Sequence, residues 1–172
     1  MAIYALGDNV PKIHSDAFVH PDAVVIGDVT IGQYSSVWPM AVLRADYGPI
    51  NIGNETSVQD GTVIHASAGL ATVIGSRCVI GHLAHLEGCT VEDDSLIGSG
   101  SIVLHRALVQ SHSLVGANSV VTNGTTVPSY SMALGVPASI IPNRVKEGSF
   151  AVIVSNYVEN GQRYKVGIKR VD

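Results

Sequence analysis

Charged and aromatic side chains are scarce in this chain of 172 residues. Asp, Glu, Lys and Arg together make up 14% of it and aromatic residues 5%, whereas charged residues form about 25% of an average globular protein. Leu is also scarce, with 10 residues against 40 for Val and Ile together. Because β-branched side chains disfavour helices and favour strands, this balance excludes a helical bundle. A hydrophobic content of 46% excludes a disordered chain.

Other features are missing as well. No apolar run approaches the roughly 18 residues of a membrane span, and no signal-peptide pattern opens the chain. The two cysteines, Cys78 and Cys89, do not make a disulfide framework. A net charge of −4 argues against a nucleic-acid-binding surface. We therefore expect a soluble, cytoplasmic β protein with neither a nucleic acid nor a membrane as partner.

An aliphatic residue recurs every six positions through most of the chain, with a small residue two positions before most of these sites. Nineteen positions follow the repeat. They are Val19, Val25, Ile31, Val37, Leu43, Ile52, Val58, Ile64, Ile74, Ile80, Leu86, Val91, Ile97, Val103, Val109, Val115, Val121, Val127 and Ala133.

This spacing predicts an all-β fold, a parallel β-helix. In a strand, residues two apart point to the same side, so each hexapeptide sends one branched and one small side chain inward. Three hexapeptides close a triangular coil of about 18 residues, and successive coils stack about 4.8 Å apart. The pattern resembles the left-handed hexapeptide-repeat family, and this resemblance supplies the left-handed sense of the coil.

Two breaks in the repeat, at 44–50 and 67–71, predict outward loops. After Pro128 the repeat fades, and residues 136–142 are expected to form an exit strand. Apolar residues at helical spacing predict a C-terminal α-helix over about 147–163, which Ser149 would cap. We therefore divide the chain into a β-helix domain, 1–142, and a C-terminal helix and tail, 143–172, packed on the β-helix.

The register of the repeat places polar residues in two columns. Arg44, His65 and Glu87 follow inward residues of one face on successive coils, and Asp60 and His82 stack at a corner of the neighbouring face. The columns diverge around the corner, so one chain cannot easily bring both to a common point. Two copies side by side can, which predicts a site at a subunit interface.

Three stretches of this chain resemble the gamma-class carbonic anhydrase family, including its ferripyochelin-binding-protein-like relatives. They are 42–46 (Val-Leu-Arg-Ala-Asp), 58–65 (Val-Gln-Asp-Gly to His) and 80–90 (Ile-Gly-His to Gly-Cys-Thr). The resemblance spans about residues 8 to 142. It implies a homotrimer that holds zinc between subunits and interconverts CO2 and bicarbonate, with two metal histidines from one chain and the third from its neighbour.

The resemblance also implies roles for single residues. His65 and His82 match two of the metal ligands, and Gln59 matches the residue that orients the metal-bound water. Tyr157 resembles a tyrosine on the family's terminal helix and is a candidate catalytic residue with Gln59. The residues that match an interface ion pair and its partner are Arg44, Asp46 and Asp60.

The chain departs from the family pattern at Glu87, where the family has the third histidine. Glu87 could ligate zinc itself, since two histidines and a glutamate form a known hydrolytic zinc set. His85 could replace it, although its position would require a shifted strand, or no tight metal site exists. Cobalt or iron could use the same ligands. An anionic ligand raises the pKa of a metal-bound water, so we expect a weak or absent hydratase.

Three functions stay open from the sequence. The first is an enzyme, a carbonic anhydrase-type lyase. The second is a hexapeptide acyltransferase or CoA-thioester hydrolase; transferases of this fold use a loop histidine, and neither predicted loop contains one. The third is a catalytically silent trimeric scaffold or small-ligand binder. His105, two residues after Val103, could approach the site from the next coil, but we expect it to be a corner histidine without a role in the site.

Overall fold

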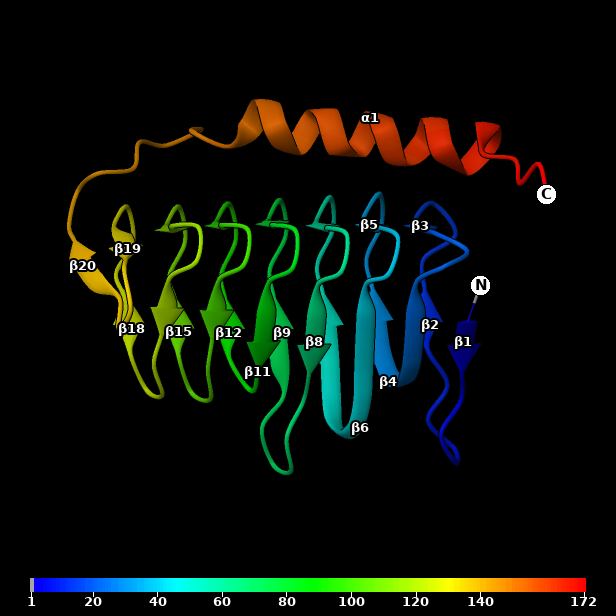
Figure 1. Ribbon diagram of the computed structural model, residues 1–172, viewed down its shortest axis with the longest axis horizontal. Coiled ribbons are helices and arrows are strands. Elements are labelled where there is room, and N and C mark those ends of the chain that lie inside the picture. The colour runs from blue at the N-terminus through cyan, green and yellow to red at the C-terminus, as the bar shows by residue number, and fades with distance from the viewer. Residues whose placement is uncertain (1) are drawn as a thin grey trace.

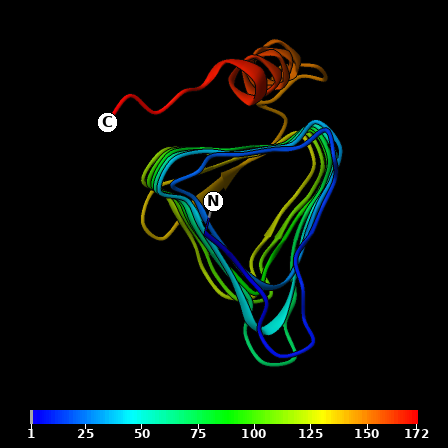
Figure 2. The ribbon, with the colours of Figure 1, turned by 90° about the vertical axis from the view of Figure 1, so that its right-hand side faces the viewer.

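The computed structural model describes residues 2–172, which form a left-handed parallel β-solenoid of about seven turns with one helix packed along it (Figure 1). Figure 2 looks down the solenoid axis and shows a triangular cross-section. The predicted fold class is therefore confirmed. The strands of each coil lie on three flat faces, which we call the first, second and third face.

Strands β4 (Val24–Ile31) and β6 (Val42–Ile52) begin on the first face and continue around a corner onto the third. The other first-face strands are β1 (Ala2–Tyr4), β8 (Val63–His65), β11 (His85–Glu87), β14 (Ile102–Val103) and β17 (Val120–Val121). The other third-face strands are β2 (Lys12–Ile13), β9 (Thr72–Ile74), β12 (Thr90–Val91), β15 (Leu108–Val109) and β18 (Thr126–Val127).

The second face is a separate sheet. Its parallel strands are β3 (Phe18–Val19), β5 (Ser36–Val37), β7 (Ser57–Val58), β10 (Val79–Ile80), β13 (Leu96–Ile97), β16 (Leu114–Val115) and β19 (Met132–Leu134). The exit strand β20 (Ser139–Ile141) pairs antiparallel with β19, within the segment where the sequence predicts it.

The core consists of the inward residues of the repeat. Leu43, Ile64 and Leu86 stack on one another in the first face and are fully buried. Small residues occupy the inward positions two before them, and Thr62 at one such position donates its hydroxyl to the carbonyl of Gly81 at 2.9 Å. Every buried side-chain nitrogen or oxygen in residues 2–172 has a hydrogen-bond partner. Neighbouring coils thus satisfy each other's polar groups, as a stacked solenoid requires.

Both breaks in the repeat are insertions at the corner between the first and third faces, the lowest corner in Figure 2. Opposite the single residue Asp28 of β4, strand β6 carries the four residues 46–49. Ser67 and Leu70 bridge a tight turn one coil further on. The insertions place Asp46 and Ser67 beside the column of polar residues on the first face.

Helix α1 (Ala151–Gly167) lies along the second face and contacts β3, β5 and β7 (Figure 1). The predicted bounds, 147–163, and the Ser149 cap are wrong. Gly148 has a φ of +74°, and the hydroxyl of Ser149 accepts a hydrogen bond from the Lys146 amide at 3.1 Å. This turn delays the helix start to Ala151. None of the described residues forms a helix with the length and apolarity that a bilayer crossing requires.

The helix is extended at its other end by an aromatic cluster. The ring of Tyr164 lies 5.1 Å from that of Trp38 and 5.9 Å from that of Phe18. Tyr157, two turns earlier, lies 5.8 Å from Trp38. The contacts of Tyr164 lie just beyond the predicted range, which explains why the helix continues past Arg163.

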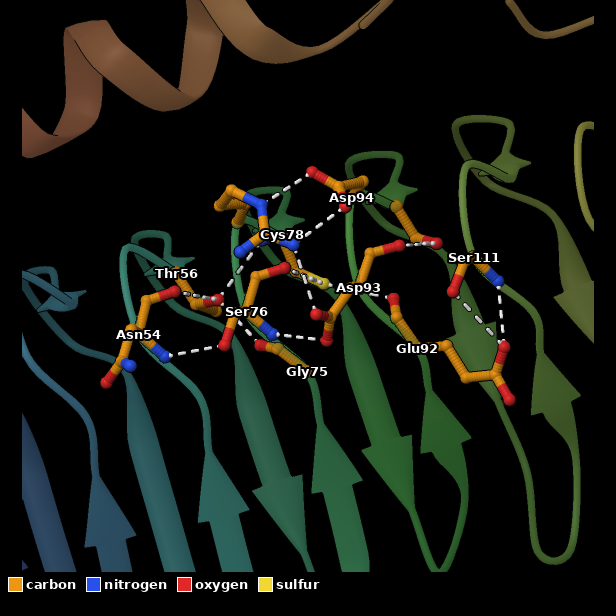
Figure 3. Close-up of polar contacts among 11 residues, drawn as sticks. Asn54, Thr56, Gly75, Ser76, Cys78, Glu92, Asp93, Asp94 and Ser111 are labelled. Carbon is orange, nitrogen blue, oxygen red and sulfur yellow. Dashed lines mark hydrogen bonds and ion pairs between the residues drawn. The ribbon is translucent and has the colours of Figure 1, made fainter. Parts of the chain in front are cut away.

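A ladder of polar side chains runs along the solenoid edge that faces α1 (Figure 3). The backbone N–H of Asn54 donates to Ser76 Oγ at 3.1 Å, and the backbone N–H of Ser76 donates to Asp93 Oδ1 at 2.9 Å. On the next coil the Ser111 amide donates to Glu92 at 3.0 Å. The ladder caps backbone groups of successive turns, so it stabilises the stack of coils.

Candidate functional site

Arg44, His65 and Glu87 form one column on the first face. Arg44 on β6 is the register partner of His65 on β8, and His65 is the partner of Glu87 on β11. This is the register that the hexapeptide phase predicts. The side chains point outward because the neighbouring residues Leu43, Ile64 and Leu86 point into the core.

His65 lies between two carboxylates. Its Nε2 atom is 2.8 Å from Asp46 Oδ1, and its Nδ1 atom is 2.9 Å from Glu87 Oε1. Arg44 in turn donates to the second oxygen of Asp46. A neutral imidazole has one N–H, so in that form His65 donates to one of the two carboxylates and keeps a lone pair on its other nitrogen. The column is thus a continuous chain of polar contacts from Arg44 to Glu87.

The surroundings keep both carboxylates ionised. Burial opposes the ionised form of Asp46, but hydrogen bonds from His65 and Arg44 outweigh it and lower the pKa of Asp46. For Glu87, the hydrogen bond from Ser67 is the largest cause, and together with His65 it lowers the pKa to about 2 against the opposing effect of burial. Glu87 is therefore an acceptor at neutral pH and is free to ligate a cation.

The structure brings Ser67, His85 and His105 to Glu87; the sequence analysis considered His85 beside Glu87, favoured a corner position for His105 and gave Ser67 no role. Ser67 Oγ lies 2.7 Å from Glu87 Oε1 and 3.0 Å from His105 Nε2. His105 Nε2 lies 3.4 Å from Glu87 Oε1, and His85 Nε2 lies 3.4 Å from Glu87 Oε2.

One expectation is corrected by these distances. His105 is not an isolated corner histidine, because its Nε2 atom approaches Ser67 and Glu87, although Leu86 pairs with Val103 and the residue opposite Glu87 is therefore Leu104. The pairing of β11 with β8 and β14 is regular, and His85 Nε2 approaches Glu87 Oε2 in this register, while its role as an alternative third ligand stays a prediction. The contacts of His85 and His105 with Glu87 show that a histidine side chain can reach a residue other than its register partner on the first face.

A second polar cluster lies at the corner between the first and second faces, beside α1. His82 Nδ1 lies 2.9 Å from Asp60 Oδ2, and the side chains of both residues are 48% exposed. Gln59 is buried. Burial raises the pKa of Tyr157 on α1, the charge of Asp60 adds to the rise, and a hydrogen bond from Gln59 opposes it. Gln59, Asp60, His82 and Tyr157 thus form one cluster.

The two clusters stay apart within one chain, as the column argument predicts. Among the described residues, no group of three or more His, Cys, Asp or Glu side chains is arranged to hold a metal ion. The chemistry of the donor set nevertheless suits zinc, because two imidazoles and a carboxylate form an established zinc set. One chain brings two of these donors together, His65 and Glu87.

Fold and site define a hexapeptide-repeat protein, and comparison with known proteins gives the same class. Residues 11–45 match the family described as bacterial transferase hexapeptide (six repeats). The Escherichia coli K12 carnitine operon protein CaiE is 36% identical over 143 residues, which cover 83% of this chain and 73% of CaiE. The chain belongs to the hexapeptide-repeat family of gamma carbonic anhydrase-like proteins.

Two further proteins that are similar to this chain have different names. Gamma carbonic anhydrase 2 of Arabidopsis thaliana mitochondria is 42% identical over 109 residues, which cover 60% of this chain and 39% of the plant protein. The chain therefore spans about two-fifths of the length of that relative. A Bacillus cereus protein provisionally named an acetyltransferase has a solved structure with a TM-score of 0.93 and 36% identity, covering 95% of this chain and 96% of that one. A cytoplasmic location stays a prediction, since the plant relative is mitochondrial.

Proposed function

We propose that this protein is a gamma-class carbonic anhydrase-like enzyme that interconverts CO2 and bicarbonate slowly at a metal site shared between copies of the chain. The observation that carries the proposal is the contact between His65 and Glu87 at 2.9 Å on successive coils. It brings together two side chains that could ligate a metal, at positions where the family resemblance implies ligands, with Glu87 in place of the family's histidine. The name of the plant relative, gamma carbonic anhydrase 2, supports the same activity.

His65 and Glu87 of one copy would hold the metal together with His82 of a second copy. Zinc fits this donor set, and cobalt or iron accept the same donors. When bound, zinc supplies the Lewis acidity that lets a water molecule lose a proton near neutral pH. His85 remains an alternative third donor from the first copy, because it lies 3.4 Å from the Glu87 carboxylate.

The remaining residues of the chain hold and orient these groups. Asp46 accepts from His65 Nε2, and Arg44 fixes Asp46, so this ion pair sets the orientation of the imidazole. Gln59 is buried beside Tyr157, so its amide has a fixed orientation and suits the role of orienting water or bicarbonate. The negative charge of Glu87 is the reason we propose slow turnover, because it offsets part of the charge of a metal.

Exposed apolar residues beside both clusters support a homotrimer. Leu83 adjoins His82 and is 72% exposed, and Met40 at the same corner is 67% exposed. Val63 lies on the first face, two residues before His65, and is 38% exposed. Apolar side chains of this size next to half of a site are typical of surfaces that a second copy covers. Carbon dioxide and bicarbonate are the partners that a site between such copies would take.

Acyl transfer or hydrolysis of a CoA thioester is a second candidate. The fold and the provisional name of the B. cereus relative favour it, and so does the contact of His105 Nε2 with the Ser67 hydroxyl at 3.0 Å. An imidazole within reach of a hydroxyl in a loop is the arrangement that such chemistry uses. Release of CoA from acetyl-CoA by the metal-free protein would favour this candidate over the first.

The experiment that tests the proposed function is the replacement Glu87→His. With zinc added, the stopped-flow rate of CO2 hydration should be slow for the wild-type protein and should rise in the variant, because a neutral ligand leaves more charge on the metal. Glu92→His is the matched control, since Glu92 lies on another coil edge and contacts Ser111 (Figure 3). A Glu87→His protein that binds zinc and shows no hydration would leave the silent scaffold as the better account.

A further inference from the structure

The two carboxylate oxygens of Glu87 have different surroundings. Oε1 accepts from Ser67 Oγ at 2.7 Å and lies 3.4 Å from His105 Nε2, and His65 Nδ1, the nitrogen that Asp46 leaves unoccupied, lies 2.9 Å from the same oxygen. Among residues 2–172, the polar neighbour of Oε2 is His85 Nε2 at 3.4 Å, a distance beyond that of a good hydrogen bond. One oxygen is therefore anchored and the other is available.

The contacts around Oε1 have a fixed direction. An ionised carboxylate only accepts hydrogen bonds, so Ser67 must donate its single proton to Glu87. Ser67 Oγ then has only lone pairs to offer His105, so His105 Nε2 must carry a hydrogen and donate to it at 3.0 Å. His105 therefore donates to Ser67, and Ser67 donates to Glu87, so both hydrogen bonds point toward the carboxylate.

Packing holds this chain of donors in place. Ser67 begins the tight turn after β8, which the Ser67–Leu70 bridge closes. The ring of His105 lies over Gly88, where an added Cβ would sit 3.0 Å from the imidazole Cδ2. Glycine at this position thus makes room for the ring directly behind Glu87. Three successive coils contribute one residue each to the arrangement.

We propose that Ser67 and His105 are positioning residues that anchor Oε1 of Glu87 and leave Oε2 to ligate a divalent metal such as zinc. This inference rests on the proposed function and adds two residues to it. A glutamate side chain is more flexible than an imidazole, so its carboxylate needs hydrogen-bond partners that hold it in position. Residues that hydrogen-bond to a metal-ligating side chain commonly account for about 10- to 100-fold in metal affinity. Ser67 and His105 therefore compensate for the replacement of the family's histidine by Glu87.

The test is the affinity of the full-length protein for zinc and for cobalt, measured by competition with a chromophoric chelator. Ser67→Ala and His105→Asn should each weaken binding by about tenfold or more. Ser67→Thr retains the hydroxyl and should bind as the wild type does. The visible absorption of the cobalt form should shift in Ser67→Ala and not in Ser67→Thr, a change that a purely structural role would not produce.

Matched controls separate positioning from a general effect on folding. Ser111→Ala removes another serine hydroxyl that contacts a glutamate, Glu92, at 3.3 Å on a different edge. His112→Ala removes an imidazole that stacks on Tyr130 at the far corner. Both controls should leave metal affinity unchanged. Circular dichroism of each variant verifies the fold, and His105→Asn, which alters a side chain that is 30% exposed, keeps the test valid if Ser67→Ala fails to fold.

The possible outcomes distinguish the inference from the function on which it rests. If the wild type binds metal and both variants bind it equally well, the positioning role is wrong and the proposed function stands. If the wild type binds neither zinc nor cobalt, the proposed function fails and the inference fails with it. Weaker binding in Ser67→Ala and His105→Asn, with Ser67→Thr and the controls unchanged, supports both.

Discussion

Replacement of Gly53 by Ala tests the close stacking of coils on which the whole fold depends. An ideal Cβ at Gly53 would lie 2.5 Å from the Gly75 carbonyl carbon and 2.6 Å from its oxygen, both backbone atoms of the next coil. Ordinary contact between such atoms is about 3.5 Å, so the two coils would have to part by about 1 Å. That movement would stretch the hydrogen bond from Gly53 N to Ile74 O, now 2.8 Å, beyond useful length.

The expected cost combines this lost hydrogen bond with the strain of parting the coils. A buried backbone group left without a partner costs about 1–3 kcal/mol, and overpacking costs about 1–3 kcal/mol. We therefore expect Gly53→Ala to lower the free energy of unfolding by about 2–5 kcal/mol, which a domain of this size shows as a fall in Tm of about 5–15 °C.

Thermal unfolding followed by circular dichroism measures this change. Gly167→Ala is the control, because no atom lies within 4 Å of the added Cβ and alanine favours a helix. The control should unfold at the wild-type temperature or slightly above it. Equal Tm values for Gly53→Ala and the wild type would refute the stacking argument.

Two further predictions concern ionisable groups away from the site. The Arg77 hydrogen bond lowers the pKa of Asp94 from its ordinary value of 3.8, so this pair stabilises the fold above about pH 4 and the contribution is lost as the pH falls through the lowered pKa. Asp94→Asn should be less stable than the wild type to urea at pH 7, and the difference should shrink at about pH 2.5; a constant difference contradicts the pairing. Burial raises the pKa of Cys78 and of Cys89 to about 12, so a thiol reagent should label neither without denaturant and both in urea, and rapid labelling of the native protein would exclude their inward positions.

The hexapeptide phase was enough to predict the fold and the main column of the site. Register follows from side-chain alternation, and the core position of Ile64 fixes the outward position of His65 next to it. The partnership of His65 with Arg44 and with Glu87 follows in turn from counting three repeats along the chain, with the inserted loop residues left out of the count. Such periodic features depend on backbone geometry alone, which a repeat specifies fully.

Features that depend on side-chain reach and loop geometry were not predictable in the same way. The approach of His105 and Ser67 to Glu87 depends on the tight turn after β8 and on the space above Gly88. The start of α1 depends on the turn at Gly148, and apolar spacing carries no information about such a turn. The division into domains at residue 142 and the roles of the site residues stay predictions.

The most direct test of the account is the metal content of the protein, purified without chelator or histidine tag and measured by plasma mass spectrometry. The account predicts about one zinc, cobalt or iron per chain, because each interface between copies would contain one set of His65, Glu87 and His82. A folded protein with almost no metal, which takes up none when zinc is added, would contradict a metal-dependent enzyme and leave the β-solenoid as a scaffold.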